Sequence, residues 1–145
     1  MAIELGKVNV TDLSENNYKP LGIGINKVSN SNGIFSVNFT TLSQAKDNLI
    51  NLIMTKKEER VMNPDFGCGV WELLFEQIDE ESLNIKIENA IVDAVKTWLP
   101  YLKIEKIVFD YDNKDIDLNS IYLEINFSLA SNPALTEQIS INIKN

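Results

Sequence analysis

The sequence predicts an α+β fold in which two main helices pack on a small, mostly antiparallel C-terminal sheet, preceded by an extended N-terminal arm. Two stretches carry apolar residues at intervals of three or four, as amphipathic helices do. The last third of the chain alternates apolar and polar residues, as strands do. The first 40 residues are instead rich in Asn, Ser and Gly. We therefore expect an arm at residues 1–40 and one domain at residues 41–145.

The composition is that of an ordinary globular domain, and it argues against several classes of partner. The chain has 145 residues, of which 44% are hydrophobic and 23% charged, which is enough for one core. Its 21 acidic residues outnumber its 13 basic ones, and no basic cluster offers a footprint for a phosphate backbone, so we expect no nucleic-acid partner. No apolar run approaches the roughly 20 residues that span a bilayer, so we expect no membrane partner.

Cysteine and histidine usage limits the chemistry open to the chain. Cys68 is the one cysteine, so it forms no internal disulfide and cannot alone supply the thiolates of a structural zinc site. Histidine is absent, which removes the usual general base and the commonest zinc ligand. We expect no cofactor and no metal, and any catalysis would have to use carboxylates, Lys, Tyr or the lone thiol.

The first expected elements are weak strands followed by a helix. Turn-forming residues at 29–33 separate two short apolar stretches, which predicts one or two strands within the arm, with a hairpin as the alternative. A helix is expected over residues 41–54, capped by Thr40 or Thr41. Its core face carries Leu42, Ala45, Leu49, Leu52 and Ile53.

A loop and a second long helix follow. Residues 56–69 break the helical period, and Pro64 with Gly67 and Gly69 predicts an ordered loop or a short strand with a turn. The dense apolar segment at residues 70–75 predicts about two helical turns. The clearest helix runs from about residue 80 to residue 99, with acidic residues at its positive dipole end and Pro100 stopping it.

Strands complete the domain. Alternation predicts strands at residues 103–111 and 120–129, joined as a hairpin by a polar linker. Asn132 and Pro133 predict a break, after which a last strand runs from Glu137 to Ile143. Because a terminal strand is easily left at a sheet edge, this strand is a candidate for pairing with another chain.

The acidic residues could form an acid/base pair or a calcium site. In both cases a purely structural role is the favoured interpretation. Glu72 and Glu76 lie one helical turn apart, as an acid/base pair could, but solvated charge explains them better in so acidic a chain. The acidic residues between Asp110 and Asp117 loosely follow the spacing of a calcium loop. They lack its central glycine and terminal glutamate, which favours a polar hairpin turn.

The lone thiol and the aromatic residues are also assigned structural roles. Cys68 has no histidine to activate it, so a small buried side chain in a tight turn is the favoured interpretation. Trp71, Phe75 and Trp98 could line a pocket, but their spacing favours ordinary core packing. The residues alone therefore indicate an acidic scaffold domain without a visible active site.

The segment at residues 55–76, TKKEERVMNPDFGCGVWELLFE, resembles the signature of the contractile-tail sheath initiator family. That family occurs in the baseplate wedges of T-even-type phages, in type VI secretion systems and in related injection particles. Its Pro-x-Phe-Gly turn corresponds to residues 64–67, and its Leu-Phe-Glu ending corresponds to residues 74–76. The order of elements agrees from about residue 41 to residue 143.

The resemblance implies a structural protein that anchors to baseplate wedge proteins and starts tail sheath polymerisation by strand pairing, and not an enzyme. The implied partners are wedge proteins, the sheath protein and the tube or its initiator, with several copies around a six-fold baseplate. The implied location is the virion tail baseplate, assembled in the host cytoplasm, or the cytoplasm for a bacterial system. The implied wedge or structural residues are Glu59, Arg60, Pro64, Phe66, Gly67, Phe75 and Pro100; the implied sheath-pairing residues are Glu137, Ile139, Ile141 and Ile143.

Two positions depart from the family pattern, and one alternative function remains open. Glu58 replaces the usual glycine of a Gly-Glu-Arg motif, and of a Glu-Pro-Arg motif only Pro100 survives, between Leu99 and Tyr101. The alternative is a lysozyme-like peptidoglycan hydrolase, for which Glu59 paired with Glu72 or Glu76 would supply the two carboxylates that glycosidases need.

Overall fold

The computed structural model describes residues 21–28, 35–74, 80–110 and 120–144. The chain divides into two compact units, Met1–Asp47 and Asn48–Asn145. The boundary between them falls inside the first long helix, and each unit is described by itself. The division into an arm at residues 1–40 and a domain at residues 41–145 stays a prediction.

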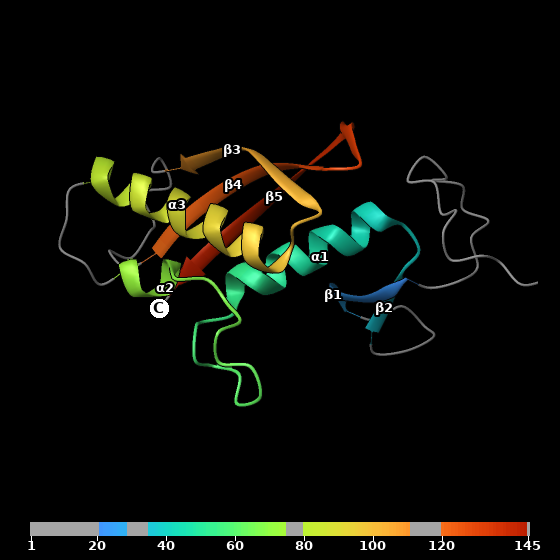
Figure 1. The fold of residues 1–145 in the computed structure, drawn as a ribbon, viewed down its shortest axis with the longest axis horizontal. Coiled ribbons are helices and arrows are strands. Elements are labelled where there is room, and N and C mark those ends of the chain that lie inside the picture. The colour runs from blue at the N-terminus through green and yellow to red at the C-terminus, as the bar shows by residue number, and fades with distance from the viewer. Residues whose placement is uncertain (1–20, 29–34, 75–79, 111–119, 145) are drawn as a thin grey trace, which may run out of the picture. The chain divides into compact units, whose positions relative to one another are not determined.

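The first unit contains an antiparallel hairpin and the start of helix α1. Strand β1 (Gly22–Val28) pairs with strand β2 (Phe35–Asn38), which confirms the expected hairpin (Figure 1). Helix α1 (Thr41–Met54) begins where the Thr40 hydroxyl accepts a hydrogen bond from the Ser43 amide at 3.1 Å, an N-cap that satisfies an otherwise unpaired donor. The buried Asn38 amide donates to the Asp47 carboxylate at 2.5 Å and thereby ties β2 to the helix.

The second unit contains the rest of α1 and two further helices. Helix α2 (Val70–Leu73) is short, and helix α3 (Glu80–Trp98) is the longest in the described ranges. The buried residues of α1 and α3 follow the apolar stripes read from the sequence, because an amphipathic helix turns one side toward the core. These residues are Leu49, Leu52, Ile53, Ile87, Ile91, Ala94 and Val95.

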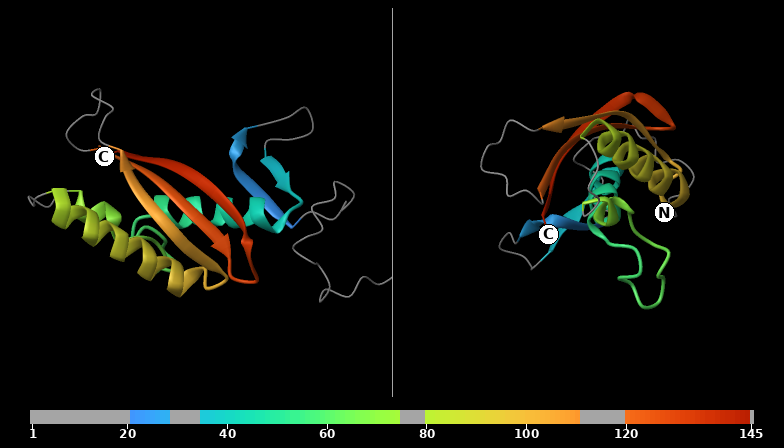
Figure 2. Two further views of the ribbon diagram at one scale, coloured as in Figure 1. Left: turned by 90° about the horizontal axis from the view of Figure 1, so that it is seen from above. Right: turned by 90° about the vertical axis from the view of Figure 1, so that its left-hand side faces the viewer.

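The sheet is antiparallel with the order β3–β4–β5, from strands β3 (Leu102–Asp110), β4 (Ser120–Leu129) and β5 (Asn132–Lys144). Figure 2 shows it curved, with α3 and the residue 48–54 part of α1 on its concave side. The odd-numbered residues of β4 from 121 to 129 and of β5 from 139 to 143 face that side and are buried: Ile121, Leu123, Ile125, Phe127, Leu129, Ile139, Ile141 and Ile143. This arrangement confirms the predicted α+β class, with two main helices on a C-terminal sheet.

The other face of the sheet is polar, with one buried exception. Gln138, Ser140 and Asn142 are exposed there, and the Gln138 amide donates to the Glu124 carboxylate at 3.0 Å. The buried Ser128 hydroxyl donates to the Glu105 carboxylate at 2.8 Å. That hydrogen bond, assisted by the ammonium of Lys103, lowers the pKa of Glu105.

Two predicted elements were wrong in extent. The segment expected to form two helical turns makes a single one, α2, which ends at Leu73, and Phe75 lies outside the described residues. The break expected at Asn132 and Pro133 is instead the start of β5, where the β4–β5 register shifts between Ser128 and Leu129. A proline is tolerated at a strand start because its missing N–H removes no hydrogen bond from the regular part of the ladder.

Truncation of the central core residue should test this packing. Phe127 is the largest fully buried side chain among the described residues, so Phe127→Ala should lower the free energy of unfolding by about 3–5 kcal/mol through lost burial and the cavity left behind. Ile85→Ala, at an exposed site on α3, should change it by less than about 0.5 kcal/mol. Urea denaturation of both variants measures the difference, and equal effects would contradict the assigned core.

Candidate functional site

The loop between α1 and α2 is closed at its base by close backbone contact. The Cys68 amide donates to the Thr55 carbonyl at 3.0 Å, and Lys56 forms a parallel bridge with Cys68. Gly67 has a φ of 135°, and a Cβ placed there would lie 2.7 Å from the Thr55 carbonyl oxygen. Only glycine therefore fits at this position.

Glu59 and Arg60 hold the loop from within. The Glu59 carboxylate accepts a hydrogen bond from the Lys56 amide at 2.9 Å. The Arg60 guanidinium lies 3.8 Å from the centre of the Phe66 ring and donates to the Asn51 side-chain oxygen at 3.3 Å. Both residues thus have partners inside this unit, where they stabilise the loop.

A stack of side chains connects the loop to α3. The Phe66 ring meets Trp98 edge to face, with centroids 5.2 Å apart and planes at 63°. Phe66 thus contacts both the Arg60 guanidinium and Trp98, and these three side chains, called the stack below, link the loop to the end of α3. Across the loop, the Pro64 carbonyl accepts a hydrogen bond from the Glu58 amide at 2.8 Å.

Cys68 is a core residue. It is fully buried, its thiol lies 3.7 Å from the Ala90 carbonyl oxygen, and burial raises its pKa. A buried thiol with a raised pKa is a poor nucleophile, which supports the structural interpretation of this residue. Beside it, the Trp71 indole N–H donates to the Ile53 carbonyl at 3.0 Å, so α2 is attached to the end of α1.

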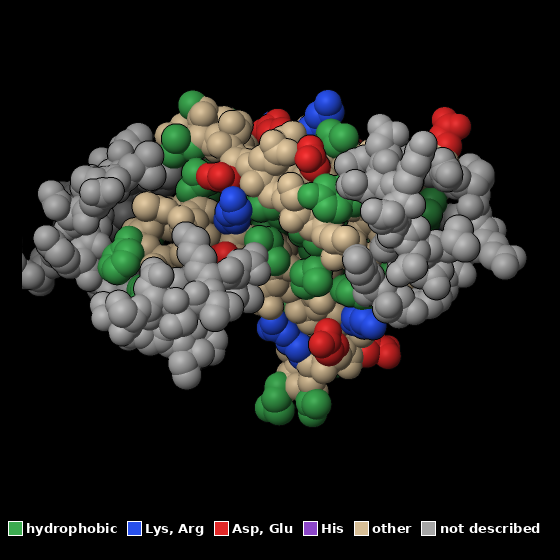
Figure 3. Space-filling view, turned by 180° about the vertical axis from the view of Figure 1, so that it is seen from behind, with side chains coloured by type: hydrophobic (Ala, Val, Ile, Leu, Met, Phe, Trp, Pro, Cys, Tyr) green, Lys and Arg blue, Asp and Glu red, His purple; other side chains and the backbone are tan. Residues whose placement is uncertain are grey.

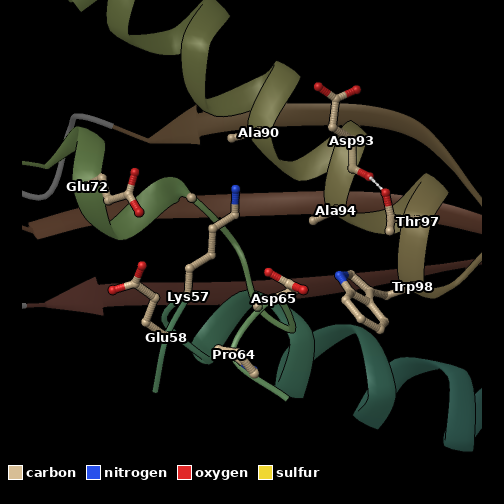
Figure 4. A pocket seen from close by; sticks show the side chains of 12 residues that line it. Lys57, Glu58, Pro64, Asp65, Glu72, Ala90, Asp93, Ala94, Thr97 and Trp98 are labelled. Atoms are coloured by element: carbon tan, nitrogen blue, oxygen red, sulfur yellow. Dashed lines mark hydrogen bonds between the residues drawn. The ribbon is translucent and has the colours of Figure 1, made fainter. Parts of the chain in front are cut away.

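A pocket of about 410 Å³ lies between the loop, α2 and α3. Figure 4 shows the Lys57 ammonium pointing into it, with carboxylates around it and Trp98 forming one side. Its lining residues are Lys57, Glu58, Pro64, Asp65, Gly67, Gly69, Glu72, Ala90, Asp93, Ala94, Thr97 and Trp98. Ordinary core packing was therefore the wrong expectation for Trp98, which is half-buried and faces a pocket.

The carboxylates proposed for a hydrolase are not brought together as the sequence suggested. Glu72 lines the pocket, but Glu59 is not among its lining residues and is engaged by the Lys56 amide. Glu76 lies outside the described residues. The acidic residues that line the pocket beside Glu72 are Glu58, Asp65 and Asp93. No spacing in the sequence predicts this grouping.

The described ranges contain neither a metal-binding cluster nor a membrane-spanning helix. No group of three or more His, Cys, Asp or Glu side chains there could hold a metal ion. Of the residues with calcium-like spacing, Asp110 ends β3 and the others lie outside the described residues. Within the part of the chain that the structure describes, no helix has the length and apolar character needed to span a bilayer.

Comparison with known proteins decides the family. The family model "Baseplate wedge protein gp25" matches residues 43–134. The chain belongs to this family. The gp25 of Enterobacteria phage T4 is 30% identical over 106 residues, which are 70% of this chain and 74% of that protein. The chain is accordingly a structural component of the baseplate of a contractile tail.

Solved structures show the same fold for the gp25-family domain. A candidate tail lysozyme from Geobacter sulfurreducens has a TM-score of 0.64 and 21% identity, covering 75% of this chain and 95% of that one. A chain of the anti-feeding prophage baseplate has a TM-score of 0.59 and 22% identity, covering 72% of this chain and 79% of that one. At these identities the likeness concerns the fold alone.

The two departures from the gp25-family pattern now have structural descriptions. Glu58, at the usual glycine position, has a φ of 66°, a left-handed conformation that costs a residue with a Cβ about 1–2 kcal/mol. In the turn after α3, Leu99 is buried, Pro100 is exposed and the Tyr101 hydroxyl accepts a hydrogen bond from the Asn48 amide at 2.8 Å. Leu99 and Tyr101 therefore contribute to the fold of this unit.

Restoring the glycine should stabilise the protein. Glu58→Gly should raise the free energy of unfolding by about 0.5–1 kcal/mol, because the relief of the left-handed strain exceeds the added flexibility of the unfolded chain. Glu58→Ala keeps the strain and should change it by less than about 0.5 kcal/mol. Thermal and urea unfolding of the two variants give the comparison; a gain in the alanine variant alone would refute the explanation.

The opposite change at the loop base should be harmful. Gly67→Ala should lower the free energy of unfolding by at least about 2 kcal/mol, since the new Cβ would collide with the backbone of Thr55 and Lys56. Gly69→Ala is the matched control, because the nearest atom to its Cβ would be the Lys57 ammonium at 3.7 Å, an ordinary contact. Equal melting temperatures for the two variants would contradict the proposed closure.

Proposed function

We propose that this chain initiates sheath polymerisation on the baseplate wedge, with the free edge of β5 pairing with a strand of the first sheath ring. The partners would be wedge proteins, the tail sheath protein and the tube or its initiator, with copies arranged around a six-fold baseplate assembled in the host cytoplasm. The observation that carries the proposal is the long edge of β5 with which no other described strand pairs. Pairing of this kind gains affinity from main-chain hydrogen bonds.

β5 offers a suitable edge for such pairing. It spans 13 residues, and among the described strands it pairs with β4 alone. The positions from 138 to 143 carry no charge, whereas natural edge strands that must avoid partners usually carry charges, prolines or bulges. This stretch therefore lacks the features that block strand addition.

The opposite edge, β3, is protected by those features. Lys103, Glu105 and Lys106 place charges along it, and the β3–β4 register shifts between Ile104 and Lys106. A register irregularity and charged residues both disfavour the addition of another strand. The two edges of this sheet thus differ, and the difference favours β5 as the one that accepts a partner.

The isoleucines of β5 hold this strand against the core. Ile139, Ile141 and Ile143 are buried against the helices, so an incoming strand would not contact their side chains directly. They would fix the position of β5, together with Glu137, which pairs with Phe127 near the start of the regular ladder. The side chains on the open sheet face, Gln138, Ser140 and Asn142, would be the ones beside an arriving strand.

The loop between α1 and α2 would face the wedge. Glu59, Arg60, Pro64, Phe66 and Gly67 give it a defined shape through the contacts described above, and a rigid loop loses little conformational entropy on binding. Pro100, exposed in the turn after α3, would belong to the same anchoring function, as would Phe75.

A charged β5 should fail to recruit sheath. Ser140→Lys with Asn142→Lys should leave baseplates intact but reduce the fraction of baseplates that carry sheath at least tenfold, because lysines on an edge strand disfavour strand addition. The measurement is negative-stain electron microscopy of particles assembled with the full-length variant. Deletion of the strand would be a poor test, since it removes three core isoleucines.

The control places the same charge on the same face of the central strand. Tyr122→Lys with Asn126→Lys modifies β4, whose two edges are already paired, opposite Asn142 and Gln138. This variant should recruit sheath normally. Normal sheath on the β5 variant, or equal loss in both variants, would refute edge pairing.

A further inference from the structure

We propose that Val61 and Met62, at the tip of the loop between α1 and α2, insert into an apolar socket of a neighbouring wedge protein. These two residues are called the tip below. The inference rests on the wedge-anchoring part of the proposed function and adds to it the contact residues and the chemistry of the partner surface.

The tip is unusually exposed for apolar side chains. Val61 and Met62 are each 95% exposed, whereas the next most exposed large apolar side chains in the described ranges are Ile23 at 60% and Ile85 at 56%. Figure 3 shows two apolar side chains together at the end of the projecting loop, beyond the charged ones. Single exposed apolar residues are common. Two adjacent ones on a projecting turn form an apolar surface patch, which is unfavourable in water and is typical of a binding site.

The tip is also held in place. The Asn63 amide donates to the Arg60 carbonyl at 3.2 Å and closes a turn around Val61 and Met62. Behind this turn stand the Arg60, Phe66 and Trp98 stack and the hydrogen bond from Glu58 to Pro64. None of these contacts uses the tip side chains, so the loop presents them in a fixed position without needing them for its own stability.

The charges around the tip indicate the kind of partner. The exposed charged residues of the loop balance three against three: Lys56, Lys57 and Arg60 against Glu58, Glu59 and Asp65. A balanced ring does not select an anionic nucleic acid or membrane surface, and the net charge of −8 opposes both. An apolar centre with a mixed-charge rim is the usual anatomy of a protein–protein contact.

A second copy of this chain is a poor socket. The pocket beside α3 is lined by Lys57 and by the carboxylates of Glu58, Asp65, Glu72 and Asp93. Seating Val61 or Met62 there would remove water from these charges without giving them partners, which is unfavourable. The socket is therefore expected on a different protein of the wedge.

The first experiment measures protection of the tip in assembled baseplates. Met62→Cys adds an exposed thiol to a chain whose native Cys68 is fully buried. Maleimide should label the variant rapidly in the free protein and at least tenfold more slowly in purified baseplates. Equal labelling rates in the two states would overturn the proposal, as would protection in the free protein that disappears on dilution, because that result would indicate self-association.

The second experiment measures competition for incorporation. Full-length wild type and Val61→Ser with Met62→Ser are coexpressed with the other tail proteins of the particle, and their ratio in purified baseplates is read by mass spectrometry. Loss of two buried apolar side chains should favour the wild type by at least about 100-fold. The control is Ile85→Ser, at the exposed site on α3, which should compete equally. Equal competition by the tip variant, or equal exclusion of the control, would refute the tip contact.

These outcomes separate the tip from the sheath proposal. A tip variant that is excluded while the wild type forms sheathed particles supports the anchoring contact. A tip variant that enters baseplates at the wild-type ratio refutes it and leaves edge pairing by β5 standing. Absence of the wild-type chain itself from baseplates would refute both.

Discussion

The second unit depends on the close approach of two backbone segments at the base of the loop. Where Gly67 and Cys68 meet Thr55 and Lys56, the end of α1 is joined to the start of α2. The buried Cys68 thiol reaches the Ala90 carbonyl of α3 from the same place. Three helices thus converge there through a glycine, a small thiol and main-chain hydrogen bonds, without any disulfide. A side chain at residue 67 would collide with the backbone of Thr55 and Lys56 at this point.

The alternation of the sheet determines which parts of it can meet another protein. Because successive side chains of a strand point to opposite faces, the isoleucines of β5 are committed to the core, and only its polar side chains and its main chain remain available. A register slip of one residue would turn the isoleucines outward. Burial of this face therefore also determines which main-chain groups of β5 are available to a partner strand. Core packing and recognition are therefore two consequences of one pattern.

The regular elements could be predicted because their signal is local and periodic. Helix α1 has the predicted bounds, and α3 ends one residue before its predicted end, since the stripes of Leu49 and Ile87 repeat over several turns. The loop was harder to predict. The left-handed conformation of Glu58 is visible in the sequence only through comparison with a family glycine, because glutamate itself does not indicate a positive φ.

The stack in the loop could not have been deduced from spacing. Arg60, Phe66 and Trp98 come from a loop and a distant helix end, and tertiary contacts of this kind leave no periodic trace. The start of β5 was misjudged for a related reason: proline usually interrupts a strand, but here it falls where the ladder is already irregular. Pocket residues such as Glu58, Asp65 and Asp93 were likewise brought together by folding alone.

A subunit with an unpaired strand edge must avoid pairing with copies of itself before its partner arrives. The uncharged positions of β5 offer little local protection, so the protection has to act over a longer range. The net charge of −8 supplies it, because like-charged copies repel over roughly the 8–10 Å screening length of physiological salt, before main-chain hydrogen bonds can form. The proposed anchoring contact uses apolar side chains surrounded by balanced charges, so this repulsion does not oppose it. A chain that initiates sheath polymerisation and anchors through the tip as proposed would therefore repel its own copies and still dock.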